Sequence, residues 1–273
     1  MKINKKNPNG VKTNKFLIAV LGILFIFLAA AYIFEKPAAL LTETLFLFPV
    51  FLSTAAGFSA AGIYGLKSHN GKALLLIAFG LSFWSAGELV WYIFKNFMGI
   101  DPFPSIADLF FLLAYPLLLT GILYGTRLTQ IKWSQMDKKT TAAGLATVII
   151  LTAAVSYWGI YEAYDPQTGF LENVVVMSYG VADLILIGSL IFSLGIARVF
   201  RGGRFGTFWT LVTVGFFFNL AADILFAIYR SSYSEDLKPY MYIDLIWMAG
   251  YLLVAYSLLD NALSLRAIHK KLK

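Results

Sequence analysis

Long apolar runs, bounded by charged or turn-forming residues, dominate the pattern of hydrophobic and polar positions along the chain. A run of about 20 such residues is long enough to cross the ~30 Å hydrocarbon core of a bilayer as a helix. The sequence contains eight runs, at residues 16–34, 44–66, 73–95, 105–126, 141–160, 174–197, 206–229 and 240–261. The pattern therefore predicts an all-α integral membrane protein with eight transmembrane helices.

The composition excludes an ordinary water-soluble protein. Of the 273 residues, 59% are hydrophobic and 14% are charged, and the mean hydropathy of +0.73 leaves too few charges for a globular surface. The chain has no cysteine, which excludes disulfides, thiolate metal sites and cysteine nucleophiles. It also lacks a P-loop, a dinucleotide-binding fingerprint and a kinase signature, so no recognisable catalytic motif indicates an enzyme.

Basic residues are concentrated on one side of the predicted bundle. Of the 22 lysines and arginines, 18 fall on the side that holds both termini, in the segments 2–15, 67–72, 127–139, 198–204 and 266–273. By the positive-inside rule we expect both termini in the cytoplasm and the protein in the plasma (inner) membrane. The net charge of +7 is then mainly an orientation signal with contacts to anionic membrane lipids, and nucleic-acid binding is not expected.

The predicted helices fall into two similar halves. Matching positions recur at an offset of 135 or 136, and they include Glu88 with Asp223, Asp108 with Asp244, and Tyr115 with Tyr251. A weaker match at an offset of 130 puts Ser53 opposite Asp183. Because each half has an even number of spans, we expect two parallel four-helix repeats, related by an axis along the membrane normal.

The predicted organisation follows from this division. A basic cytoplasmic N-terminal tail at residues 1–15 precedes the first half at 16–139 and the second half at 140–261. A basic C-terminal tail at residues 262–273 completes the chain.

Acidic residues remain inside the predicted helices after the loops are assigned: Glu88, Asp108, Asp183, Asp223 and Asp244. A carboxylate at a helix centre costs on the order of 2.5 to 3.5 kcal/mol on insertion scales, so such residues usually face a bundle interior or a wet cavity and mark function. The predicted helix directions put all five in the outer half of the membrane or near its midplane. Asp108 and Asp244 lie one turn into their helices, where capping of the helix N-terminus explains them equally well.

Polar side chains share helix faces with these acids. Tyr179 and Asn219 precede Asp183 and Asp223 by four residues, Ser85 precedes Glu88 by three, and Tyr115 and Tyr251 follow Asp108 and Asp244 by seven. The predicted site for a cation or small ligand comprises the five acids with Tyr115, Tyr179, Asn219 and Tyr251. We expect this polar network to open to the outer side.

Aromatic residues gather at the outer ends of the helices: Trp91, Tyr92, Trp158, Tyr161, Tyr164, Tyr229, Tyr233, Tyr240 and Tyr242. One interpretation is an interfacial belt of the kind common in membrane proteins. The other is an aromatic and acidic vestibule, which attracts organic cations through cation–π and Coulombic interactions.

Several cofactors are not expected. The two histidines, His69 and His269, fall in an inner loop and in the C-terminal tail, so a bis-histidine haem and a zinc–histidine site are excluded. No lysine lies inside the last two spans, so retinal has no Schiff-base partner there. A divalent metal held by carboxylates stays open, because hard cations need only oxygen ligands.

The most distinctive segment runs from Pro102 to Leu117 and reads PFPSIADLFFLLAYPL. It resembles the P-S-x-A-D-x-x-[FY]-L-x-x-Y-P pattern in multi-pass N-terminal membrane modules of bacterial and archaeal histidine kinases and diguanylate cyclases. The matching positions include Asp108, Tyr115 and Pro116, and the resemblance implies a sensory input module. Because 13 residues follow Asp260, no kinase, PAS or cyclase output domain is expected, and a signal would pass to a separate cytoplasmic partner.

Three functional classes follow from the sequence. The leading hypothesis is a sensor-like membrane module in which protonation or ligand binding at Glu88, Asp183 and Asp223 shifts helix packing, with Pro49 and Pro116 as candidate kinks. The second is a small proton- or cation-coupled transporter whose halves rock for alternating access. The third is a carboxylate–metal membrane enzyme. A homo-oligomer is compatible with all three.

Overall fold

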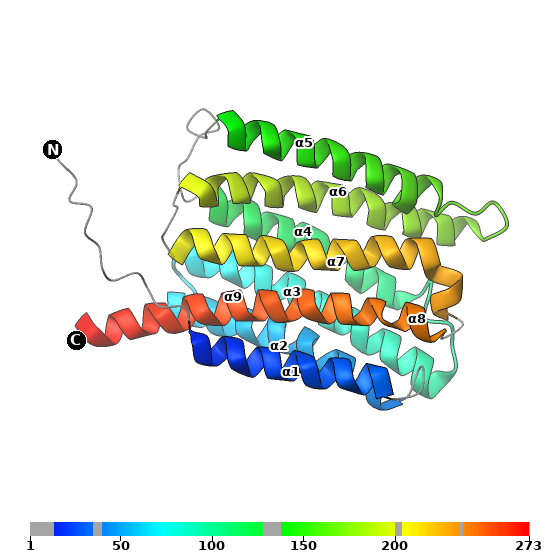
Figure 1. The fold of residues 1–273 in the computed structure, drawn as a ribbon, viewed down its shortest axis with the longest axis horizontal. Coiled ribbons are helices and arrows are strands. Elements are labelled where there is room, and N and C mark those ends of the chain that lie inside the picture. The colour runs from blue at the N-terminus through cyan, green and yellow to red at the C-terminus, as the bar shows by residue number, and fades with distance from the viewer. Residues whose placement is uncertain (1–13, 35–39, 128–137, 200–203, 235–236, 273) are drawn as a thin grey trace.

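The computed structural model describes residues 14–34, 40–127, 138–199, 204–234 and 237–272. These parts of the chain are helical and contain no strand (Figure 1). The longer helices are α1 (Lys15–Phe34), α2 (Leu40–Tyr64), α3 (His69–Ile93), α4 (Ile106–Arg127), α5 (Lys138–Ala154), α6 (Phe170–Val199), α7 (Arg204–Ser234) and α9 (Ile243–Leu272). The short elements are the π-helical segments η1 (Phe94–Met98) and η3 (Val155–Tyr161), which extend α3 and α5, and the single turn α8 (Lys238–Met241).

Eight helical segments of the described chain are long and apolar enough to cross a membrane. Each one overlaps a span predicted from hydropathy, so the polytopic all-α architecture is confirmed. The prediction worked because a continuous apolar run of this length can satisfy its backbone hydrogen bonds in lipid only as a helix.

Within the described residues, six helices form a closed ring in the order α2, α3, α4, α6, α7 and α9, with α9 packed against α2. Figure 1 shows α6, α7 and α9 in front of α4, α3 and α2, with α5 and α1 at the margins. These marginal helices expose much of their surface; Ile23 of α1 is 68% exposed and Ile150 of α5 is 66% exposed. Each predicted half supplies three consecutive ring helices, while the duplication itself stays a prediction.

Glycines allow the ring helices to approach closely. A Cβ atom at Gly80 of α3 would lie 2.5 Å from the side chain of Leu118 in α4. A Cβ atom at Gly250 of α9 would lie 2.8 Å from the carbonyl oxygen of Gly215 in α7, and still closer to the side-chain amide nitrogen of Asn219. Small residues at such positions let backbones touch, which is the usual basis of helix association in membranes.

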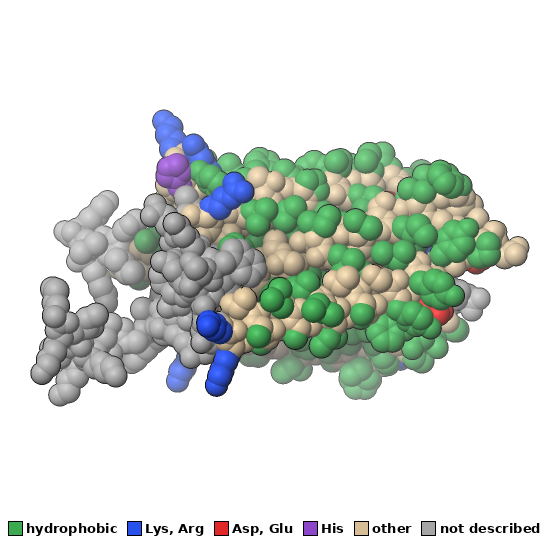
Figure 2. Space-filling model, turned by 90° about the horizontal axis from the view of Figure 1, so that it is seen from above, with side chains coloured by type: hydrophobic (Ala, Val, Ile, Leu, Met, Phe, Trp, Pro, Cys, Tyr) green, Lys and Arg blue, Asp and Glu red, His purple; other side chains and the backbone are tan. Residues whose placement is uncertain are grey.

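The two ends of the bundle differ in charge. The start of α1 and the end of α9 lie at the same end (Figure 1), where the backbone N–H of Asn14 donates to Asp260 Oδ1 at 3.2 Å. Basic residues of this end include Lys15, Lys67, Lys72, Arg127, Lys138, Lys139 and Arg266. Figure 2 shows blue side chains gathered there, and green apolar side chains along the rest of the visible surface. We call this the basic end and the opposite one the acidic end.

The structure departs from the sequence-based expectations in detail. Helix α9 continues to Leu272, so residues 262–272 of the predicted basic C-terminal tail are helical. Most of the predicted N-terminal tail lies outside the described residues. Pro49 and Pro116 lie inside α2 and α4. Helix α7 has a kink at Tyr229, whose backbone angles of φ −110° and ψ 22° are not helical.

Candidate functional site

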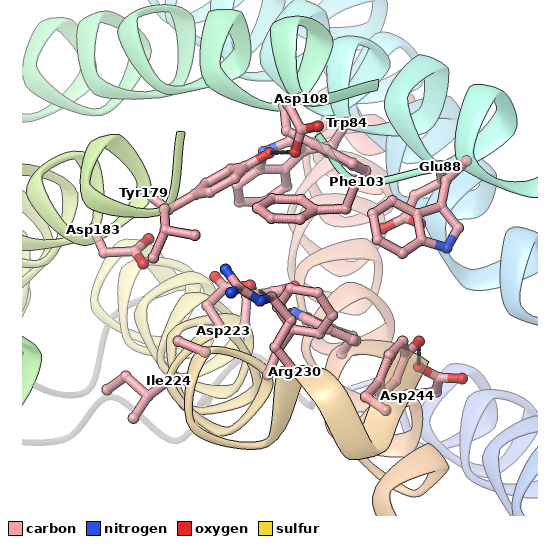
Figure 3. A pocket seen from close by; sticks show the side chains of 18 of the residues that line it. Trp84, Glu88, Phe103, Asp108, Tyr179, Asp183, Asp223, Ile224, Arg230 and Asp244 are labelled. Carbon is pink, nitrogen blue, oxygen red and sulfur yellow. Dashed lines mark hydrogen bonds between the residues drawn. The ribbon is translucent and has the colours of Figure 1, made fainter. Parts of the chain in front are cut away.

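The ring of helices encloses a cavity of about 130 Å³ in the half of the bundle near the acidic end. All of the predicted ligand-binding residues line it: Glu88, Asp108, Asp183, Asp223, Asp244, Tyr115, Tyr179, Asn219 and Tyr251. Figure 3 shows the acidic side chains directed into the space between the helices. The structure therefore brings the predicted site residues together, whereas their role in binding stays a prediction.

Asp108 both caps α4 and contacts α6. Its Oδ2 accepts a hydrogen bond from the backbone N–H of Ser105 at 2.7 Å, and Ser105 Oγ accepts one from the backbone N–H of Ala107 at 3.0 Å. This arrangement is a capping box, so the capping explanation for Asp108 is correct. Its Oδ1 accepts a hydrogen bond from the Tyr179 hydroxyl at 2.8 Å, so both carboxylate oxygens are occupied.

A second hydrogen bond between α4 and α6 mirrors the first, because the hydroxyl of Tyr115 donates to Asp183 Oδ1 at 2.7 Å. Each helix thus supplies an aspartate to a tyrosine of the other. The sequence placed Tyr115 beside Asp108 and Tyr179 beside Asp183, on the same helix faces, but the hydrogen bonds run between helices. Both helices run from the acidic end, so their residues lie at matching depths, and a tyrosine side chain reaches outward to a neighbouring helix.

Asp244 is enclosed by two tyrosines from other helices. The hydroxyl of Tyr32 in α1 donates to Oδ2 at 2.9 Å, and that of Tyr233 in α7 donates to Oδ1 at 2.7 Å. Asp244 is 3% exposed, and both of its oxygens accept hydrogen bonds. Tyr251, the expected companion of Asp244, instead donates to Glu88. Tyr32 and Tyr233 therefore hold Asp244 in place between α1, α7 and α9.

Asp223 has one fixed oxygen, because the indole N–H of Trp247 in α9 donates to its Oδ1 at 2.9 Å. One turn deeper on α7, Asn219 is 4% exposed and uses its amide nitrogen to donate to the carbonyl oxygen of Gly215 at 3.0 Å. The other amide atom, Oδ1 of Asn219, is buried and has no hydrogen-bond partner in the described structure. Buried polar atoms are nearly always paired, so this oxygen requires an explanation.

Glu88 is the least constrained of the intramembrane acids. The Tyr251 hydroxyl lies 3.4 Å from its Oε1, longer than a normal hydrogen bond between oxygens. Ser85, expected beside Glu88 on α3, instead pairs with Thr54 Oγ1 at 2.8 Å and donates to the Leu81 carbonyl oxygen at 3.1 Å. Glu88 can therefore change its contacts at lower cost than Asp108 or Asp244.

Ion pairs join neighbouring helices at the acidic end. Lys95 Nζ lies 3.0 Å from Glu43 Oε1 and links the extension of α3 to α2. Arg230 Nη2 lies 2.8 Å from Glu172 Oε1 and links α7 to α6. Arg230 also stacks over the ring of Phe103, 5.5 Å from its centroid, and lines the cavity.

The sequence analysis did not select Lys95 or Arg230 as site residues. Each follows an intramembrane acid by seven residues on the same helix, Glu88 in one case and Asp223 in the other. The two cations are also 135 positions apart, the offset already found for the acids. This shared spacing is the signal that would have identified them.

Trp84 is a further site residue that was not predicted from the sequence. It lies mid-span on α3 and is 6% exposed. Its ring centroid lies 5.9 Å from that of Tyr115, 5.7 Å from Phe216 and 6.0 Å from Tyr251, so it joins α4, α7 and α9 beneath the cavity. A tryptophan far from both interfaces is unusual in a membrane span, and that position was the available signal.

The aromatic residues of the acidic end divide between the two interpretations. Trp91, Tyr92 and Tyr233 line the cavity, as a vestibule requires. Others are surface-exposed, as an interfacial belt requires: Trp158, Tyr161, Tyr164, Tyr229 and Tyr242.

The electrostatic character of the cavity is strongly acidic. Among the described lining residues the carboxylates are Glu43, Glu88, Asp108, Asp183, Asp223 and Asp244, and Arg230 is the one basic side chain. A cavity of this kind between low-dielectric walls attracts cations. In the described part of the chain no group of three or more His, Cys, Asp or Glu is placed to hold a metal ion.

Comparison of the chain with protein-family models, with curated protein sequences and with solved structures finds no match.

Proposed function

We propose that this polytopic membrane protein is a receptor-like sensor module that binds an organic cation in the acidic cavity. The observation that carries the proposal is the convergence of carboxylates from α2, α3, α4, α6, α7 and α9 on one cavity with aromatic walls. Carboxylates are expensive in a membrane, and a bound cation offsets part of that cost. Aromatic rings add cation–π attraction for an organic cation.

The proposed orientation places both termini in the cytoplasm of a plasma membrane and the cavity toward the outside. The support is the concentration of basic residues at the basic end, which the positive-inside rule assigns to the cytoplasm. A ligand then enters from the acidic end, past Trp91 and Arg230.

The proposed signal is a shift in packing between the two halves. A cation between α6 and α7 would contact Asp183 and Asp223. Asp183 is hydrogen-bonded to Tyr115 of α4, and Asp223 is hydrogen-bonded to Trp247 of α9, so all four helices are linked to the ligand. Binding therefore shifts the equilibrium between alternative packings of the six ring helices. A cytoplasmic signalling partner would detect the change in helix packing. The resemblance of the segment around Asp108 to sensor input modules supports this interpretation.

A small cation-coupled transporter is the second candidate. The observation that favours it is the placement of the cavity between two three-helix sets of the same order, α2–α3–α4 and α6–α7–α9. The ion pairs Glu43–Lys95 and Glu172–Arg230 also occupy corresponding places in these sets. Repeats around a central site are the usual basis of alternating access.

Thermal unfolding of the purified protein in detergent tests cation binding. We expect 2-phenylethylammonium at millimolar concentration to raise the unfolding temperature, and neutral 2-phenylethanol and anionic phenylacetate to have no effect. Glu88→Gln and Asp223→Asn should reduce the shift at least threefold, whereas Glu162→Gln, at an exposed acid outside the cavity, should leave it unchanged. A cation that stabilises no more than phenylethanol does would refute the proposal.

Uptake of radiolabelled 2-phenylethylammonium into proteoliposomes separates the two candidates. A sensor gives binding without net uptake. Uptake that is saturable in the wild type and abolished in Asp223→Asn would establish the transporter instead.

A further inference from the structure

We infer that Asp183, Asp223 and Asn219 form a three-acceptor site for a primary ammonium group, so that the cavity selects primary amines over quaternary ammonium ions. The inference deepens the proposed function and rests on it, because it specifies the chemical class of the cation.

The two aspartates are oriented in the same way. Asp183 Oδ1 is held by Tyr115 of α4 at 2.7 Å, and Asp223 Oδ1 is held by Trp247 of α9 at 2.9 Å. No described residue donates to Oδ2 of either carboxylate. Figure 3 shows Asp183 and Asp223 facing the same space from α6 and α7. One oriented acceptor on each helix is therefore open to a ligand.

Asn219 supplies the third acceptor. It lies one turn deeper than Asp223 on the same helix, lines the cavity and is 4% exposed. Its amide nitrogen is bound to the Gly215 carbonyl oxygen, which fixes the side-chain orientation and leaves Oδ1 without a partner. Burying an acceptor without a hydrogen-bond partner is unfavourable, so a ligand that donates a hydrogen bond to Asn219 Oδ1 would gain affinity from that contact.

The remaining aspartates of the cavity already accept a hydrogen bond on each oxygen. Asp108 accepts hydrogen bonds on both oxygens, from Tyr179 and from the backbone of Ser105. Asp244 accepts on both oxygens as well, from Tyr32 and Tyr233. Glu88 lies on α3 and is separated from Asp183 and Asp223 in Figure 3. The open acceptors therefore concentrate at the α6–α7 face of the cavity.

The number of acceptors matches the number of donors on a primary ammonium group. Such a group carries three N–H donors and needs three acceptors, as a lysine side chain does. A quaternary ammonium ion has no donor and would leave Asn219 Oδ1 unpaired. The hydrocarbon part of an amine would contact the aromatic walls, with Trp247 adjacent to Asp223.

Isothermal titration of the full chain in detergent tests the selection. The probes are 2-phenylethylammonium and N,N,N-trimethyl-2-phenylethylammonium, which share the charge and the ring and differ in N–H donors. We expect the wild type to bind the primary ammonium at least tenfold more tightly. Equal affinities would overturn the three-acceptor site and leave the proposed function intact, whereas absence of binding by both probes would refute the proposed function itself.

Variants separate hydrogen bonding from charge. Asn219→Leu removes the acceptor and should reduce the preference for the primary ammonium about tenfold, the value of one charge-assisted hydrogen bond. Asp223→Asn removes both a charge and an acceptor, because the amide oxygen is needed to accept from Trp247, so it should weaken both probes and the primary ammonium more strongly. Ser53→Ala is the matched control, because Ser53 is buried and bonds to the Val50 carbonyl oxygen of its own helix.

Two results would contradict the inference among the variants. One is that Asn219→Leu lowers the affinity for both probes by the same factor. Asn219 would then contribute through packing and not by accepting a hydrogen bond from the ammonium group. The other is tight Ca²⁺ binding that displaces the primary ammonium and is lost in Asn219→Leu, which would identify a metal site. If Asn219→Leu does not fold, the ratio of affinities in the wild type decides the question.

Discussion

The two interfaces that close the ring, α4–α6 and α2–α9, are built from side chains of different size and polarity. Helix α6 forms two side-chain hydrogen bonds with α4, one through Tyr179 and one through Asp183. Helix α2 carries Ser53 at the position that the offset of 130 aligns with Asp183, and Ser53 bonds only within its own helix. The same alignment puts large residues of α6 opposite small ones of α2: Leu186, Ile187, Leu190 and Ile191 against Ala56, Gly57, Ala60 and Ala61.

This difference shows how a ring of similar helices can be packed more loosely on one side than on the other. Small residues let α2 pack closely against α3 and α9, whereas the large side chains of α6 hold its backbone farther from α4 and α7. The space between α6 and its neighbours then receives polar side chains that reach across it. The open acceptors of Asp183 and Asp223 lie at this looser side.

Loss of a large side chain from α6 should have the greatest effect on stability. Leu190 is fully buried, so Leu190→Ala leaves a void and should lower the free energy of unfolding by about 2 to 5 kcal/mol. SDS titration in mixed micelles measures the change. Leu145→Ala on α5, where the leucine is 54% exposed, is the control and should cost about 0.5 kcal/mol or less. Equal losses in the two variants would contradict the assigned role of α6.

Replacing a small residue of α2 with a large one should lower the free energy of unfolding by somewhat less. Ala60 is fully buried on a helix packed between α3 and α9, so Ala60→Leu overpacks the interface and should cost about 1 to 3 kcal/mol. The same SDS titration applies, with Ala146→Leu at an exposed position of α5 as the control. A stabilised Ala60→Leu protein would show that α2 has room for a leucine, as α6 does at Leu190.

Removal of single hydroxyl groups compares the polar contacts. Tyr115→Phe removes the 2.7 Å hydrogen bond to Asp183, between α4 and α6, and should lower the free energy of unfolding by about 1 kcal/mol. Tyr251→Phe breaks a contact of 3.4 Å between α9 and α3 and should cost less than about 0.5 kcal/mol. Each tyrosine keeps its ring in the variant, so each serves as the control for the other. If Tyr251→Phe lowered the free energy of unfolding more than Tyr115→Phe does, the expected order of the two contacts would be wrong.

The ion pairs of the acidic end should have the smallest effects. Lys95→Met and Arg230→Met each remove a partly exposed pair and should cost about 0 to 1 kcal/mol, with the larger loss for Arg230 because of its stacking on Phe103. Thermal unfolding at low salt and at 1 M NaCl measures both, and the losses should shrink at high salt. Lys72→Met, at the exposed basic end, is the control. If the loss of stability is the same at both salt concentrations, the Lys95 or Arg230 side chain stabilises the protein by packing of its aliphatic part and not by its ion pair.

Much of the architecture could be predicted from the sequence. The eight spans follow from run length, and the gathering of Glu88, Asp108, Asp223 and Asp244 at one level follows from their distance to the helix ends. The capping explanation for Asp108 also came from position alone and is correct. These inferences succeed because hydropathy and helix rise are properties of a single segment.

The hydrogen-bond partners could not be predicted in the same way. Helical spacing placed Tyr115 with Asp108, and it gave no reason to link Tyr32 to Asp244, which is 212 positions away. A shared face says which way a side chain points, but the partner depends on which helix stands opposite. Trp247 was missed for the same reason, since its partner Asp223 is on another helix.

The sequence by itself determined that this chain spans a membrane with charged ends and an acidic interior. Burial of apolar surface and the cost of charge in lipid act on each segment separately, so composition and order suffice for these conclusions. The tertiary structure alone decided that α4 and α6 exchange aspartates and tyrosines, and that Asn219 keeps an unpaired oxygen beside Asp223. Hydrogen bonds extend over about 3 Å, so they depend on how the helices are placed against one another.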